Sequence, residues 1–185
     1  MERIRKALEQ ATRDRAQTTA AGVPDAAGRT GGFPADLSTG LRYTYTKVVD
    51  VPPSVLAEKR LIAAVPGHEM KDAYRMLRTR VLQSLREHGW TSVAVTGPAS
   101  GCGKTLTAIN LAISLAMEVT HTVLLVDLDL RKPSIHEYFG YQPEFGLSDY
   151  LLNDVPVHKI LFTPSIERLV VLPGREAIQN SSEML

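Results

Sequence analysis

The spacing of apolar and polar positions predicts a packed α/β unit in the second half of the chain. Apolar residues recur at helical spacing over residues 69–88, and Gly89 follows as a helix stop signal. Residues 105–117 show the same periodicity and predict a second helix. Continuous apolar runs rich in Val and Leu predict buried strands, and these lie at residues 91–96, 122–126 and 169–172.

Two short helices are predicted between the last two strands, at residues 133–139 and 146–152. Strand–helix–strand alternation implies a parallel sheet with right-handed crossovers and with helices packed against it. The sequence therefore predicts an α/β fold built on a parallel sheet.

The N-terminal third has a different pattern. Residues 1–16 place apolar positions at helical spacing among charges, which predicts a short amphipathic helix. Such a helix is marginal alone, and it either frays in solvent or docks on a partner or a neighbouring subunit. Much of residues 17–60 is rich in Gly, Pro, Thr and Ala, as flexible linkers are.

Within that linker, residues 41–49 alternate aromatic and polar positions and predict a short strand at a sheet edge. Pro52 and Pro53 end it. The chain therefore divides into a helix and flexible linker over residues 1–60 and a folded domain over residues 61–185.

Composition narrows the classes of protein that fit. The chain has 185 residues, and its 21 basic and 20 acidic residues leave a net charge of +1, so no global field attracts nucleic acid. Its single Cys excludes an intrachain disulfide and a multi-cysteine metal site. No apolar run reaches the roughly 20 residues that span a bilayer, and the charged N-terminus lacks the apolar region of a signal peptide. We expect a cytoplasmic protein.

The strongest chemical signal follows the first predicted strand, where residues 97–105 read GPASGCGKT. Glycines let successive backbone N–H groups surround a phosphate at the start of a helix. Lys104 is then expected to reach the β- and γ-phosphates, and the Thr105 hydroxyl to bind Mg²⁺. One glycine is displaced, because Pro98 holds its usual place and Gly97 lies one residue earlier. The motif predicts a P-loop NTPase-type fold.

The nucleotide-binding residues expected from this loop are Ser100, Gly101, Cys102, Gly103, Lys104, Thr105 and Leu106.

Two carboxylates follow the next predicted strand, at Asp127 and Asp129. The carboxyl end of a strand beside a P-loop is where open α/β sheets bind ligands. We expect Asp127 to hold Mg²⁺ or orient a nucleophile, and Asp129 to assist it; with Lys104 they form the expected catalytic set. The alternative is that each Asp only shapes a turn. Arg131 suits either a phosphate contact or a structural ion pair.

These motifs resemble those of the bacterial tyrosine kinases of capsule and exopolysaccharide synthesis, relatives of the MinD/ParA ATPases. The resemblance runs from about residue 72 to 185. Residues 97–105 are similar to the family's Walker A motif, and residues 123–136 to its Walker A′ motif. Residues 146–151 and the segments 172–174 and 180–185 match further family motifs in the same order.

The resemblance implies an ATP- and Mg²⁺-dependent autokinase that phosphorylates protein tyrosine. It also implies a membrane-embedded activator that holds the chain at the inner face of the cell membrane, and self-association through a helix that carries Asp72, Arg75 and Arg78. Without the family, Arg75 and Arg78 indicate only a solvated helix face. In the predicted flexible linker, Tyr43 and Tyr45 are candidate acceptors of the phosphoryl group.

The sequence departs from the family pattern in several places. Ser100 replaces a usual Pro, and Asp72 replaces a usual Glu. No Walker B carboxylate or Tyr-rich tail precedes Leu185, which indicates a fragment or a truncated relative with doubtful catalysis. Two other functions therefore stay open: a MinD/ParA-like ATPase switch, against which Ala99 counts because a second Lys is usual there, and a non-catalytic assembly module.

Cys102 is required by no motif. It lies beside Lys104 at the start of a helix, and both features favour a thiolate. Either it only fills a permissive position, or its thiol is reactive and its modification blocks the phosphate site.

Overall fold

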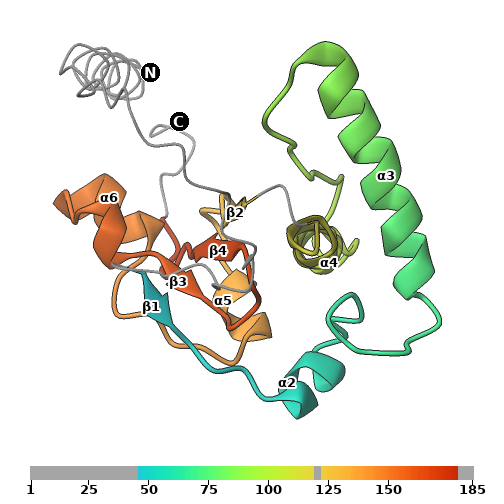
Figure 1. Ribbon diagram of the computed structural model, residues 1–185. Helices are drawn as coiled ribbons and strands as arrows, with labels where there is room; N and C mark the ends of the chain where they lie inside the picture. The colour runs from blue at the N-terminus through green and yellow to red at the C-terminus, as the bar shows by residue number, and fades with distance from the viewer. Residues whose placement is uncertain (1–45, 119–121, 179–185) are drawn as a thin grey trace, which may run out of the picture. The chain divides into compact units, whose positions relative to one another are not determined.

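Four short strands form one sheet in the order β1-β3-β4-β2, and helices pack beside it (Figure 1). The computed structural model describes residues 46–118 and 122–178, which lie in one compact unit, Gly40–Ile178. The predicted N-terminal helix at residues 1–16, together with Tyr43 and Tyr45, lies outside the described residues.

One side of the sheet follows the prediction. β2 (Val123–Val126) and β4 (Leu169–Leu172) are parallel, with Val123 opposite Leu169 and Val126 opposite Leu172. The two strands therefore end at the same edge of the sheet, as a site at their carboxyl ends requires.

The sheet is mixed rather than purely parallel, which corrects the prediction. β3 (Phe162–Thr163) runs antiparallel to β4. The connection between them is five residues long, too short for the crossover that parallel strands need. Ser165 and Arg168 adopt positive φ of 54° and 64° and turn the chain back within it.

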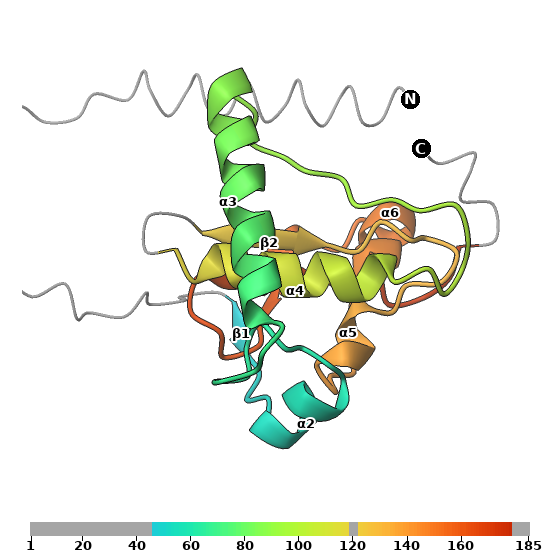
Figure 2. The same ribbon diagram turned by 90° about the vertical axis from the view of Figure 1, so that its right-hand side faces the viewer.

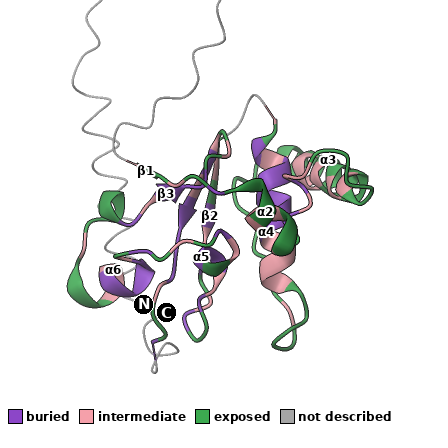
Figure 3. Ribbon diagram, turned by 90° about the horizontal axis from the view of Figure 1, so that it is seen from below, coloured by how far each residue is buried: buried purple, intermediate pink, exposed green. Residues whose placement is uncertain are grey.

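Two long helices lie in layers beside the sheet. α4 (Lys104–Ala116) lies between the sheet and α3 (Lys71–His88), as Figure 1 shows. Both confirm the predicted helices, and Gly89 ends α3 at a φ of 66°. Figure 3 shows the difference in burial: α4 is largely buried, whereas no residue of α3 is.

The predicted buried strand at residues 91–96 is wrong. These residues form no strand, and all six are exposed. Val93 and Val95 keep 49% and 37% of their surface exposed. An apolar run is buried as a strand only where neighbouring strands cover it, and none of the strands in residues 46–118 and 122–178 pairs with this segment.

The elements between β2 and β3 are short helices. α5 (Ile135–Tyr138) and α6 (Leu147–Asn153) confirm the two predicted short helices. A 3-10 helix, Val157–Lys159, leads into β3.

Residues 46–64, which we call the N-terminal strap, are part of the core. β1 (Lys47–Val48) pairs in parallel with β3 and is the edge strand predicted within residues 41–49. The prolines that were expected only to end this strand also begin α2 (Pro53–Glu58), because the fixed φ of proline suits the first position of a helix. Val51 keeps only 6% of its surface exposed, so the packed region begins before residue 60.

Candidate functional site

The loop before α4 has the backbone geometry that a phosphate-binding loop requires. Gly101 and Gly103 adopt φ of 77° and 89°, a left-handed conformation that side chains oppose. Gly103 caps α4 without a side chain, and Thr107 donates its N–H to the Gly103 carbonyl at 2.9 Å. The first N–H groups of a helix have no partner within it, so they face the loop as anion donors.

Gly97 lies one residue before the usual glycine position of the loop, and its lack of a side chain lets Cys102 and Lys104 approach the start of the loop. A Cβ atom added at Gly97 would lie 2.5 Å from Cys102 Sγ and 3.0 Å from Lys104 Cγ. Any larger residue would therefore push away both side chains. Lys104 and Thr105 are half-buried in the first turn of α4, and Ser100, Gly101, Cys102 and Gly103 are exposed.

The loop lowers the pKa of the Cys102 thiol. The largest cause is a hydrogen bond from the Ala99 backbone; the Lys104 backbone N–H and the Lys104 charge act in the same direction, and burial opposes them. Because the thiolate is the reactive form, the environment favours a reactive cysteine.

Asp127 follows β2 at the same edge of the sheet. Its N–H donates to the Leu172 carbonyl at 3.0 Å, which extends the β2–β4 ladder by one residue. Figure 2 shows α4 running beside β2 in the opposite direction, so the end of α4 that carries Lys104 lies where β2 ends. The fold thus places the loop and Asp127 at one edge of the sheet.

The Asp127 carboxylate accepts hydrogen bonds from backbone N–H groups of the loop that follows it. Its side chain is almost fully buried, with 3% of the residue exposed. Oδ1 accepts the Asp129 N–H at 3.2 Å, and Oδ2 accepts the N–H groups of Ser134 at 2.8 Å and Ile135 at 2.9 Å. The last two bonds cap α5. Burial raises the pKa of Asp127, although these hydrogen bonds oppose the increase.

Asp129 is more accessible. It is half-buried, and its Oδ1 accepts the Lys132 N–H at 3.1 Å. Within residues 46–118 and 122–178, no hydrogen bond or ion pair joins Asp127 or Asp129 to the P-loop residues, and Asp129 Oδ2 has no such partner. Arg131 is exposed beside them.

The sequence did not reveal that the segment after β4 and the start of α6 support Asp127. A Cβ atom added at Gly174 would lie 2.3 Å from Pro133 Cβ and 3.5 Å from Asp127 Cγ. The Leu147 and Ser148 N–H groups donate to the Pro173 and Gly174 carbonyls at 2.7 and 3.2 Å. The start of α6 therefore holds the segment after β4 against Asp127. The only signal in the sequence was the family-like residues 146–151 and 172–174.

The residues expected to serve self-association lie apart from this edge, on α3. Asp72 and Arg75 form an exposed pair, with Arg75 Nη1 2.9 Å from Asp72 Oδ1. Arg78 instead binds the C-terminal end of α4 and the residues after it: its Nη1 donates to the Ser114 carbonyl at 3.0 Å, and its Nη2 lies 3.3 Å from Glu118 Oε1.

The part of the chain that the structure describes contains no group of three or more acidic, His or Cys residues arranged to hold a metal ion. Of the two residues expected to bind Mg²⁺, Thr105 is half-buried in the first turn of α4 and Asp127 is almost fully buried after β2. No helix in the same residues combines the length and apolar character that crossing a membrane needs.

Comparison with known proteins agrees with this geometry. Residues 93–170 match the CobQ/CobB/MinD/ParA nucleotide binding domain. The chain is 31% identical over 141 residues to the putative tyrosine-protein kinase EpsB of Ralstonia nicotianae, which covers 74% of this chain and 19% of EpsB. It is 32% identical over 114 residues to the tyrosine-protein kinase YwqD of Bacillus subtilis, covering 62% of this chain and 48% of YwqD. The chain thus spans half or less of these relatives.

Among solved structures, the fold is similar to the kinase domain of the Escherichia coli tyrosine kinase ETK. The TM-score is 0.62 at 25% identity, over 76% of this chain and 59% of that one. The chimerical protein CapA2B2 is similar with a TM-score of 0.56 at 27% identity, over 75% of this chain and 58% of that one. These similarities confirm the resemblance to bacterial tyrosine kinases and the P-loop type of fold.

Proposed function

We infer that this chain, which carries a MinD/ParA-type nucleotide-binding domain similar to bacterial tyrosine kinase domains, binds ATP with Mg²⁺ and transfers the γ-phosphoryl group to protein tyrosine. The observation that carries this proposal is the loop itself. Gly101 and Gly103 hold left-handed turns ahead of Lys104, at the edge where β2 ends in Asp127. The process served is capsule or exopolysaccharide synthesis, as the family resemblance implies.

Each residue has a proposed task. The loop amides and Lys104 neutralise the β- and γ-phosphates, and the loop set runs from Ser100 to Leu106. Thr105 and Asp127 hold Mg²⁺, which neutralises charge on the phosphates when bound. Asp127 keeps capacity for this, because a carboxylate accepts about four hydrogen bonds and three are used here.

Asp129 is the more accessible of the two carboxylates for a tyrosine hydroxyl, because its Oδ2 is free of partners among the described residues and it is less buried. In the transfer, the tyrosine oxygen bonds to the γ-phosphorus, the bond from that phosphorus to the bridging oxygen breaks, and ADP leaves. The tyrosine proton passes to Asp129. Catalysis is mainly positioning, so an acceptor tyrosine must be delivered in line, from a neighbouring subunit or a partner.

We also propose the setting of this activity. A membrane-embedded activator holds the chain at the inner face of the cell membrane, and Asp72 and Arg75, with Arg78 behind them, form the self-association surface. The support is the family resemblance and the exposure of the Asp72–Arg75 pair. Recovery of the chain with membranes only when the activator is co-expressed would test this setting.

A second function has one observation in its favour. The Asp127 carboxylate is buried and shared among three backbone N–H groups, as in a purely structural turn. This supports an assembly module that binds nucleotide without transferring phosphate.

Incubation with γ-labelled ATP separates these functions. Label on tyrosine supports the kinase, release of phosphate alone supports an ATPase switch, and neither with retained ATP binding supports the assembly module. Asp129→Asn is expected to abolish the tyrosine label while ATP binding stays within a few-fold, with Asp154→Asn, an exposed Asp distant in sequence, as control. Equal labelling of Asp129→Asn and the parent would remove Asp129 from the mechanism.

A further inference from the structure

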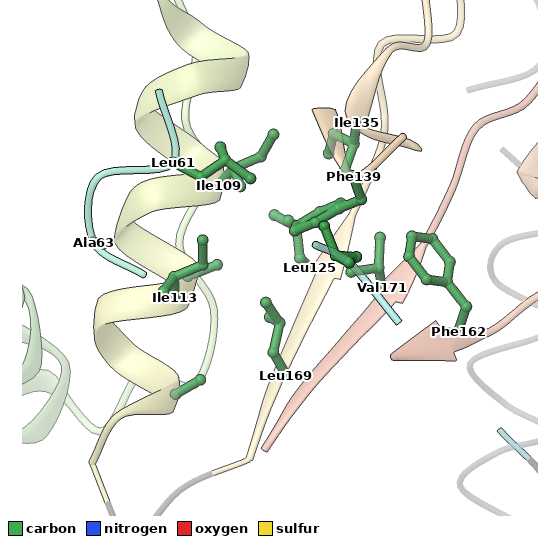
Figure 4. Close-up of a cluster of buried hydrophobic side chains, with 13 residues drawn as sticks. Leu61, Ala63, Ile109, Ile113, Leu125, Ile135, Phe139, Phe162, Leu169 and Val171 are labelled. Carbon is green, nitrogen blue, oxygen red and sulfur yellow. The ribbon is translucent and has the colours of Figure 1, made fainter. Parts of the chain in front are cut away.

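The N-terminal strap, residues 46–64, is anchored at two places in the fold. At one end, the Val49 N–H donates to the Thr163 carbonyl at 2.8 Å, and Ser165 Oγ donates to the Val49 carbonyl at 2.9 Å, so the strap is joined to β3. At the other end, Leu61 and Ala63 are 0% and 1% exposed. Figure 4 shows these two side chains beside Ile109 and Ile113 of α4.

The end of α2 directs backbone groups of the strap toward α4. Arg60 has a φ of 56°, and its N–H donates to the Ala57 carbonyl at 3.0 Å. The Leu61 N–H donates to the Leu56 carbonyl at 2.8 Å. These two bonds form a Schellman turn, which satisfies the end of α2 and leaves the Arg60 carbonyl free for another donor.

The Asn110 side chain of α4 binds the Arg60 carbonyl of this turn and the Ala63 N–H that follows it. Its side-chain Oδ1 accepts the Ala63 N–H at 2.9 Å, and its Nδ2 donates to the Arg60 carbonyl at 3.1 Å. The same Nδ2 donates to the Leu106 carbonyl at 3.0 Å. Asn110 is 0% exposed. A buried amide is costly unless its groups are paired, and here both donors and one acceptor site are used.

The bond to Leu106 lies within α4 and joins the amide that binds the strap to the first turn of the helix, next to the phosphate loop. Leu106 lies in the first turn of α4 with Lys104 and Thr105. Asn110 is six residues after Lys104, a rise of about 9 Å along the helix. The strap therefore holds α4 within two turns of the P-loop, and through β1 it holds the far edge of the sheet as well. The strap thus connects α4 to the side of the sheet formed by β1 and β3.

We propose that the strap is a positioning element of the nucleotide site and that Asn110 is its positioning residue. The proposal rests on the proposed nucleotide binding at the P-loop. Phosphate recognition depends on the placement of the loop amides and of Lys104, and a shift of about 1 Å in a binding group is enough to lose much of the interaction. Without the Asn110 bonds, apolar contacts such as those of Leu61 and Ala63 join the strap to α4, and such contacts do not fix the position of the helix along its axis.

The test compares two truncations of buried polar side chains in the same helix. Asn110→Ala removes the three bonds of the amide. Ser114→Ala is the matched control, because Ser114 is 2% exposed and its Oγ donates to the Tyr74 carbonyl of α3 at 3.3 Å, away from the strap. Each variant is measured at a temperature where unfolding curves show that it is fully folded.

Two measurements are made on each variant: ATP affinity by calorimetry, and the rate of Cys102 alkylation without nucleotide. We expect Asn110→Ala to weaken ATP binding about tenfold or more and to change the alkylation rate, since both depend on loop placement. Ser114→Ala should leave both within about twofold. These two measurements distinguish a positioning role from a loss of stability, because a variant that is only less stable keeps its affinity and alkylation rate while it is folded.

The outcomes separate this inference from the proposed function. If the parent binds no ATP, the proposed function fails, and the alkylation rates alone decide whether the strap positions the loop. If the parent binds ATP, and Asn110→Ala matches Ser114→Ala in affinity and alkylation rate, the positioning role is overturned. Should Asn110→Ala not fold, Asn110→Leu replaces it, because it removes the same three hydrogen bonds with little change in side-chain volume. A folded Asn110→Leu with parental affinity and alkylation rate would equally overturn the role.

Discussion

Arg175 Nη1 lies 2.6 Å from Asp149 Oδ1, and this ion pair joins the segment after β4 to the start of α6. Asp149 Oδ2 also accepts the Gly146 N–H at 2.8 Å. The carboxylate is therefore held from two sides in a site where its side chain is only 10% exposed. Because Gly174 packs against Pro133 and Asp127, the pair supports the edge of the sheet that carries the candidate site.

Breaking this pair is expected to destabilise the fold. Arg175→Ala should lower the free energy of unfolding by about 1–3 kcal/mol, because it leaves a nearly buried carboxylate without its charged donor. Arg75→Ala is the matched control: it breaks an exposed pair, and we expect less than about 0.5 kcal/mol. Denaturant unfolding measures both, and equal small losses would show that burial adds nothing to the Arg175 pair.

The same carboxylate predicts a dependence of stability on pH. Burial raises the pKa of Asp149, but hydrogen bonds from Arg175 and Gly146 outweigh it and hold the pKa below its usual range. The folded state thus binds this proton less readily than the unfolded state, whose pKa is about 3.9. The stabilisation is complete above that value and is lost as pH falls through the lower, folded pKa.

Asp149→Asn should therefore flatten the fall of the unfolding free energy below about pH 4, while the parent keeps the steeper slope. Parallel curves for Asp149→Asn and the parent would contradict the assigned shift.

Lys104→Ala is expected to abolish most of the affinity for ATP while the fold stays intact. Lys104 is only half-buried, and its charge is proposed to bind phosphate rather than to hold the core together. The exposed Lys132→Ala provides a control with the same loss of charge. Calorimetry that finds equal binding by Lys104→Ala and the parent would remove the P-loop assignment.

Cys102 should react with iodoacetamide faster than a free thiol at neutral pH. The Ala99 and Lys104 backbone groups and the Lys104 charge lower the pKa of its thiol, so more thiolate is present. Bound ATP with Mg²⁺ is expected to protect it, because the nucleotide occupies the same loop. Mass spectrometry of the labelled chain gives the rate, and slow labelling that ignores ATP would leave Cys102 as a residue that only fills space.

The two arginines of α3 are expected to differ, although the sequence places them in one surface. Arg78→Ala should lower the free energy of unfolding by about 1–2 kcal/mol, since it loses the hydrogen bond to Ser114 of α4 and the ion pair with Glu118. Arg75→Ala should change the free energy of unfolding by less than about 0.5 kcal/mol and shift any oligomer toward monomer in light scattering. An oligomer that keeps its mass in the Arg75 variant would exclude Arg75 from self-association.

The sequence by itself determined the elements whose signals are local. The periodicity of residues 69–88 and 105–117 was sufficient to predict α3 and α4, because the apolar face of a helix is formed by residues three and four apart in the sequence. Gly101 and Gly103 were identifiable for the same reason, since a left-handed turn next to a Lys and a helix start is a local requirement. The motif GPASGCGKT thus located the candidate nucleotide site without any tertiary information.

Tertiary structure decided what depends on distant partners. The apolar run at residues 91–96 has strand-like residues but no neighbouring strand among the described ones, and a strand exists only through its neighbours. The sequence also assigned residues 46–60 to a linker, because nothing near them shows that Asn110, 47 and 50 residues away, binds Ala63 and Arg60. Asp127 is the clearest case: its position was readable from the strand before it, but its burial and its three backbone donors follow only from how the chain folds back around it.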